Sequence, residues 1–128
     1  MNASLTLLGR LGLALIFIIS GWGKITGYAG TQQYMEAMGV PGAMLPLVIL
    51  LELGGGLAIA SGLFTRWVAL GMAAFSVATA AVFHANFADP AQAINFWKNV
   101  SMAGGFLVLA AHGAGAYSID GWRQRTAQ

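Results

Sequence analysis

Four long apolar stretches alternate along this chain with short breaks rich in glycine and polar residues. The stretches cover residues 5–23, 43–63, 67–84 and 97–117. A helix needs about 20 apolar residues to cross the roughly 30 Å hydrocarbon core of a bilayer. Small residues interrupt the stretches more often than polar ones do, as is typical of membrane helices that pack closely. The pattern predicts an all-α integral membrane protein, a four-helix bundle with up-down topology, as one domain over residues 1–128.

The composition supports a protein that has lipid as its solvent. Charged residues make up 8% of the 128-residue chain, whereas about a quarter is usual in soluble domains. So few charges cannot cover a water-facing surface, so we expect the lipid bilayer to surround the chain. The net charge of +2 comes from too few groups to indicate a nucleic-acid partner. The chain has no cysteine, which excludes thiolate catalysis and cysteine-based metal sites.

The basic residues predict the orientation of the bundle. An even number of spans places both termini on one side of the membrane. The positive charges assigned to that side are Arg66, Arg123 and Arg125, with Arg10 nearby, and those assigned to the other side are Lys24 and Lys98. Because cytoplasmic loops carry the excess of lysine and arginine, we expect the N- and C-termini in the cytoplasm.

Two connections between the spans carry helix signals of their own. Residues 31–38 place Tyr34, Met35 and Met38 on one face and polar side chains on the other, which predicts a short interfacial helix. The third connection contains Asp89 followed by Pro90, an N-cap residue and a first-turn proline. This pair indicates that the fourth helix begins before residue 97.

Glu52 is the ionisable residue placed deepest by the pattern. It lies about halfway along the second span and shares an inward-facing stripe with Gly56 and Ile59. An intramembrane carboxylate is costly and therefore a candidate functional group. One interpretation is a buried ion pair with Arg10, since a guanidinium can reach across the difference in depth. The other is a carboxylate that exchanges protons or binds a polar group of a ligand.

A second set of polar residues falls at the outer ends of the helices. Lys24, His84, Lys98 and Asn99 could converge there in a polar mouth above Glu52. The alternatives are lysines that anchor the helix ends in the interface and a water-solvated imidazole. With two separated histidines and one membrane carboxylate, we expect no metal centre. The sequence contains no haem, dinucleotide or phosphate-loop motif.

Several short motifs carry a family resemblance along nearly the whole chain. They are Gly21-Trp22-Gly23-Lys24, Glu52-Leu53-Gly54-Gly55-Gly56-Leu57, Gly62-Leu63-Phe64-Thr65-Arg66, His84, Lys98-Asn99, Gly104-Gly105 and Tyr117-Ser118-Ile119-Asp120. In this order they resemble the DoxX family of small bacterial membrane proteins. The resemblance implies a multi-pass protein of the bacterial inner (plasma) membrane. It also implies membrane redox chemistry, because the family is named for a quinol oxidase subunit and is related to thiosulfate:quinone oxidoreductase.

Three hypotheses for the function follow. The first is a membrane subunit of a quinone-linked oxidoreductase, in which Glu52 and His84 are catalytic candidates that handle protons. The ligand-binding candidates are Arg10, Lys24, Lys98 and Asn99. A redox partner protein would then supply the electron-carrying cofactor. The second hypothesis is a transporter of a small solute or of protons, built as a homo-oligomer, and the third is a membrane scaffold or assembly factor without chemistry.

Overall fold

A computed structural model describes residues 2–127, and all the regular structure in that range is helical. The helices, in chain order, are α1 (Asn2–Thr26), α2 (Tyr28–Ala37), a 3-10 turn (Gly42–Met44), α3 (Leu45–Ile49), a π turn (Leu50–Gly54), α4 (Gly55–Ser61), α5 (Thr65–Phe83), α6 (Pro90–His112) and α7 (Ile119–Ala127). The prediction of an all-α protein is confirmed. The segment from Gly42 to Ser61 forms one continuous rod, which we call the central rod.

Within the described residues, three helices are long and apolar enough to cross a membrane. They are Asn2–Thr26 with 25 residues, Gly42–Ser61 with 20 and Thr65–Phe83 with 19. The fourth long helix, α6, has 23 residues but carries more polar side chains in its first half. Its limits also differ from the apolar stretch at residues 97–117. Asp89 caps it by accepting from the Ala91 amide at 3.0 Å, and Gly113, with φ of +89°, ends it.

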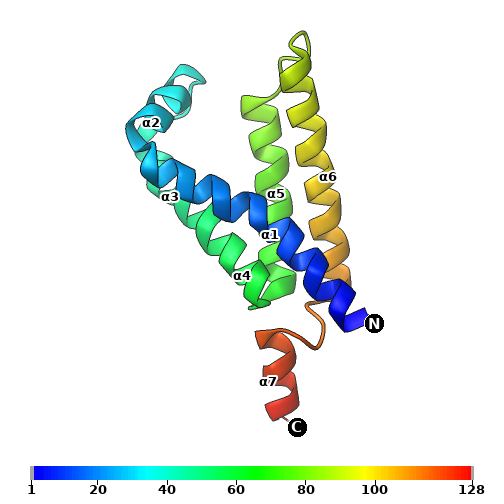
Figure 1. Ribbon diagram of the computed structural model, residues 1–128. Helices are drawn as coiled ribbons and strands as arrows, with labels where there is room; N and C mark the ends of the chain where they lie inside the picture. The colour runs from blue at the N-terminus through cyan, green and yellow to red at the C-terminus, as the bar shows by residue number, and fades with distance from the viewer. Residues whose placement is uncertain (1, 128) are drawn as a thin grey trace.

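The helices form two pairs that cross and then separate toward one end (Figure 1). In one pair α1 packs along the central rod, and in the other α5 packs along α6. The predicted interfacial helix is present as α2, and it lies at the open end of the bundle with Met35 buried. The N-terminus, the C-terminus and α7 lie at the opposite end (Figure 1).

Small residues and a few aromatic rings fill the centre of the bundle. The buried core consists of Ala14, Phe17, Ile59, Ala69, Met72, Ala73, Ala103, Phe106 and Leu109. Phe17 contacts the rings of Phe106 and Phe75, with centroids 5.6 and 6.4 Å away. Large aliphatic and aromatic side chains instead cover the outside, and Trp67 and Val108 are 78% and 69% exposed. This distribution suits a protein surrounded by lipid.

Glycines bring α1 and the central rod into backbone contact. A Cβ atom on Gly21 would lie 3.0 Å from the Leu53 amide nitrogen, and one on Gly56 would lie 3.2 Å from the Ile18 amide nitrogen. Gly55 faces the other way, against the sulfur of Met72 on α5. The glycines after Glu52 therefore serve helix packing on two sides of the rod.

The guanidinium of Arg10 links α1 to the end of α4 and to the segment that follows α6. The side chain is 1% exposed, and its Nη1 donates to the carbonyl oxygens of Ile59 at 3.0 Å and Ala60 at 2.9 Å. Its Nη2 donates to the carbonyl of Tyr117. Carbonyls in the last turn of a helix lack partners within that helix, so Arg10 caps α4. The interpretation in which Arg10 pairs with Glu52 is therefore wrong.

Asp120 caps the start of α5 at the same end of the bundle. Its two carboxylate oxygens accept from the backbone amides of Phe64 and Thr65, each at 2.8 Å, and its own amide donates to Gly62 at 2.9 Å. The first turn of α5 is thus capped from α7, where a negative charge also meets the positive end of the helix dipole. Phe64 has a φ of +48°, which gives the chain the tight turn needed between the rod and α5.

We expect Gly21→Ala to destabilise the bundle, because the new methyl group would meet the backbone of Leu53. Overpacking of this kind costs about 1 to 3 kcal/mol. Gly12→Ala is the matched control on the same helix, since nothing lies within 4 Å of its Cβ position. Thermal unfolding in detergent measures both variants, and equal melting temperatures would show that the close approach is not needed.

We expect the cap formed by Asp120 to persist until the pH falls below the ordinary range for an aspartate. Partial burial acts to raise the pKa of Asp120, but hydrogen bonds from Thr65 and Phe64 and the charge of Arg123 outweigh it and hold the pKa below 3.8. A lowered pKa contributes stability that is present above pH 3.8 and is lost as the pH falls through the folded value. The amide proton shifts of Phe64 and Thr65 should titrate with a midpoint below 3.8, and a midpoint at or above that value would contradict the cap.

Candidate functional site

A cavity of about 590 Å³ lies at the open end of the bundle, bounded by α1, α2, the central rod, α5 and α6. Its polar lining consists of Ser20, Lys24, Thr31, Tyr34, Glu52, Thr79, His84, Lys98 and Asn99, and its larger apolar side chains are Ile16, Phe17, Met35, Val40, Val48, Phe75, Phe83 and Met102. Five of the six candidate residues named from the sequence line this cavity. Arg10 does not, because it caps α4.

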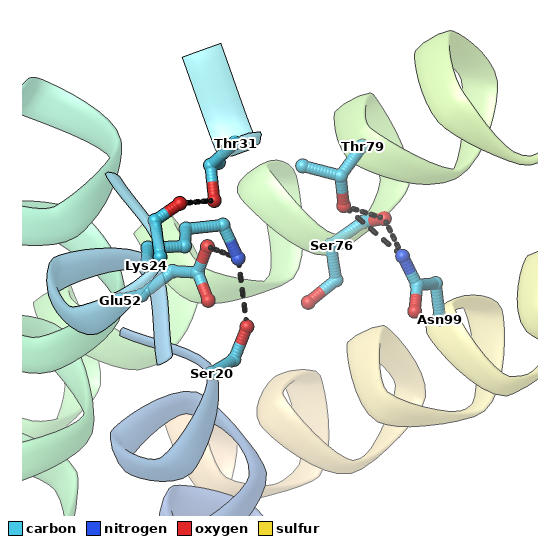
Figure 2. A network of polar contacts seen from close by, with 8 residues as sticks. Ser20, Lys24, Thr31, Glu52, Ser76, Thr79 and Asn99 are labelled. Carbon is cyan, nitrogen blue, oxygen red and sulfur yellow. Dashed lines mark hydrogen bonds and ion pairs between the residues drawn. The ribbon is translucent and has the colours of Figure 1, made fainter. Parts of the chain in front are cut away.

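The best-defined polar contact in the cavity is an ion pair between Lys24 and Glu52. Lys24 Nζ lies 2.7 Å from Glu52 Oε1 and also donates to Ser20 Oγ at 2.7 Å (Figure 2). The lysine side chain is 25% exposed and the glutamate side chain 6%. Ser20 and Lys24 are four residues apart on α1 and therefore share one helix face. Lys24 also lies in the last turn of α1, where a cation is favoured by the helix dipole.

Glu52 lies inside the π turn Leu50–Gly54. A π turn holds one more residue than an α turn, and such turns occur often at functional sites. The apolar pattern of residues 43–63 predicts a regular helix, and the π turn within it is a departure from that prediction. The available signal was the run of three glycines after Leu53, because glycine weakens the preference for α-helix.

Asn99 forms the polar group on the opposite wall. Its Nδ2 donates to the Ser76 carbonyl at 3.2 Å and to Thr79 Oγ1 at 3.0 Å, so both helices of the α5–α6 pair contribute (Figure 2). These two bonds use both amide hydrogens and leave the amide oxygen available to a donor. Thr79 was not recognised from the sequence, since a hydroxyl in a helix can bond to its own backbone and gives no polar signal.

His84 and Lys98 lie at the edge of the cavity. His84 follows the last residue of α5, and its Nδ1 lies 2.6 Å from Gln92 Oε1 near the start of α6. This contact links the end of α5 to the start of α6. Lys98 is exposed, whereas its neighbour Asn99 is 7% exposed.

An aromatic stack from two helices forms one side of the cavity. Tyr34 on α2 and Phe83 on α5 have ring centroids 5.6 Å apart and an interplanar angle of 23°. The cavity therefore combines aromatic walls with a paired carboxylate and ammonium, an imidazole and an amide. Within residues 2–127, no group of three histidine, aspartate or glutamate side chains is arranged to hold a metal ion.

We expect Lys24→Met to lower the stability of the protein by about 3 kcal/mol, because removing one partner leaves a buried carboxylate without its cation. The double variant Lys24→Met/Glu52→Leu should recover most of that loss, since it leaves no unpaired charge. Denaturant titration of the single and double variants measures the coupling. Additive losses in the double variant would show that the ion pair does not contribute to stability.

Comparison with known proteins gives a consistent result. A family model described as DoxX matches residues 5–85. The chain is 62% identical to the Inner membrane protein YqjF of Escherichia coli K12 over 114 residues, covering 89% of this chain and 88% of that one. It is 42% identical to the Inner membrane protein YphA of the same organism over 123 residues, covering 91% of this chain and 88% of the relative.

A more distant similarity covers about half of the chain. The Bacillus subtilis 168 protein named "Putative oxidoreductase CatD" is 38% identical over 63 residues, which are 49% of this chain and 47% of that protein. No solved structure matches the chain. The family model, the inner-membrane relatives and the apolar helices confirm the expected location in the bacterial inner membrane.

Proposed function

We propose that this chain, which belongs to the DoxX family, binds a quinone or a similar small amphipathic molecule in the cavity at the open end of the bundle. In this proposal it acts as the membrane subunit of a quinone-linked oxidoreductase. The observation that carries the proposal is that Lys24, Glu52, His84 and Asn99 line one cavity whose other walls are largely apolar and aromatic. Ligand sites commonly combine apolar walls with a few polar groups that fix orientation.

The chemical groups in the cavity match the two parts of such a ligand. The rings of Phe17, Phe75 and Phe83 offer surfaces for a flat conjugated head group, which packs favourably against aromatic side chains. The ammonium groups of Lys24 and Lys98 can donate hydrogen bonds to carbonyl oxygens of a quinone. An apolar tail would extend toward the lipid that surrounds the bundle.

Reduction of a quinone to a quinol takes up two electrons and two protons. Glu52, with Lys24 at 2.7 Å, and His84, which lines the same cavity, are the groups we assign to proton exchange. The electrons would come from a redox partner protein. The similarity to a protein named as a putative oxidoreductase supports a redox role for this chain.

The same proposal includes the arrangement in the membrane. We assign α6 as a fourth span, because it is 23 residues long and packs along α5. The chain is then one DoxX-like domain over residues 1–128, with four spans. Both termini lie at one end of the bundle (Figure 1), and we place that end in the cytoplasm because Arg66, Arg123 and Arg125 gather there.

We expect a short-chain ubiquinone analogue to raise the melting temperature of the purified protein, since a ligand that binds only the folded state stabilises it. Glu52→Gln should weaken the apparent affinity by about tenfold, because Lys24, which donates to the quinone, loses the carboxylate that holds its ammonium group in place, and hydrogen bonds that involve charged groups contribute about 1.5 to 3 kcal/mol. Glu36→Gln is the matched control, as Glu36 is an exposed carboxylate on α2 outside the cavity lining.

Two results would contradict the proposal. One is a melting temperature that is the same with the quinone analogue and with an alkyl alcohol of equal length. The other is a loss of affinity in Glu36→Gln equal to that in Glu52→Gln. Quinone-independent proton or solute flux into liposomes that depends on Glu52 would favour transport, and a role of Glu52 in stability alone would favour a scaffold.

A further inference from the structure

A second cavity, of about 930 Å³, lies at the end of the bundle that holds both termini. It is bounded by the start of α5, the segment after α6 and the C-terminal helix α7. Its charged lining consists of Arg66, Asp120, Arg123 and Arg125. We call it the terminal cavity, and neither the redox proposal nor the family match assigns it a role.

The three arginines are held at the walls of the terminal cavity by separate contacts. Arg66 lies over the backbone of Gly113, where a Cβ atom would be 3.2 Å from its Nε and Nη2 atoms. Arg125 Nη1 donates to the Ala116 carbonyl at 2.9 Å, and Arg123 stacks over the ring of Phe64 at 5.0 Å. Each guanidinium has five N–H donors, so most of them remain available to a ligand.

None of these arginines forms a salt bridge with a carboxylate among the residues that the structure describes. The one carboxylate in the lining, Asp120, has both oxygens bonded to the amides of Phe64 and Thr65. The salt bridge found between residues 2 and 127 joins Lys24 and Glu52 at the other end. Three arginines against one aspartate leave the terminal cavity with a surplus of two positive charges.

From this arrangement we infer that the terminal cavity binds the phosphate group of an anionic phospholipid. Guanidinium groups form paired, charge-assisted hydrogen bonds with phosphate oxygens. Two aromatic residues of the lining, Phe64 and Trp67, are 54% and 78% exposed, and the adjacent Trp122 is 59% exposed. Exposed tryptophans mark the level of the lipid head groups, which identifies lipid rather than a soluble phosphate compound as the source. The inference is independent of the ligand in the first cavity.

The test measures lipid binding by the purified full-length protein in a neutral detergent. Titration with short-chain phosphatidylglycerol should raise the melting temperature in a saturable way, and phosphatidylcholine of the same chain length should not. The variant Arg66→Gln/Arg125→Gln should bind phosphatidylglycerol about 25-fold more weakly, because each arginine near an anionic lipid contributes about 1 kcal/mol, or about fivefold. Glu36→Gln, which changes one charge at the other end and lies outside both cavity linings, should bind as the unaltered protein does.

Three outcomes would overturn the inference. The first is equal stabilisation of the unaltered protein by phosphatidylglycerol and phosphatidylcholine. This comparison does not depend on the folding of any variant. The second is equal loss of affinity in the arginine double variant and in Glu36→Gln. The third is stabilisation by inorganic phosphate that matches phosphatidylglycerol at equal concentration, since the site would then recognise a free anion.

Discussion

The close approach of α1 to the central rod is the contact on which both ends of this protein depend. Gly21 and Gly56 allow the two backbones to touch, and this fixes what the basic side chains of α1 can reach. At one end Arg10 reaches the open carbonyls of α4, and at the other Lys24 reaches Glu52. In lipid, buried polar groups must find partners within the protein. The same packing therefore gives the last carbonyls of α4 a donor and gives the Glu52 carboxylate a cation.

The sequence predicted the inward stripe of the central rod because helical spacing determines it. Glu52, Gly56 and Ile59 are buried there, and the same spacing buries Arg10, Ala14, Phe17 and Gly21 on α1. The gathering of Lys24, Glu52, His84, Lys98 and Asn99 around one cavity also follows from their depth. Periodicity reports which face a residue occupies and roughly how deep it lies.

Pairings between specific side chains could not be predicted in the same way. From its depth in the membrane, Arg10 was one expected partner for Glu52. Depth does not show that the carbonyls in the last turn of α4 are the acceptors that the guanidinium binds. Depth also gave no reason to expect Asp120, more than fifty residues along the chain, to cap α5. Both contacts depend on loop geometry at Gly62 and Phe64, whose positive φ values are tertiary features that hydropathy does not encode.

The π turn at Glu52 makes the protein sensitive to the length of the central rod as well as to its composition. Each residue of an α-helix rotates the chain by about 100°, so deleting one residue outside the π turn would turn one end of the rod relative to the other. Leu45 is fully buried on the near side of the turn, and Gly56 packs against α1 on the far side. After such a deletion the two could not both keep their places. The π turn at Leu50–Gly54 closes with one residue more than an α turn, so a single deletion there would be absorbed by a return to α geometry. Among functional relatives, changes in the length of the rod should therefore fall at the π turn rather than on either side of it.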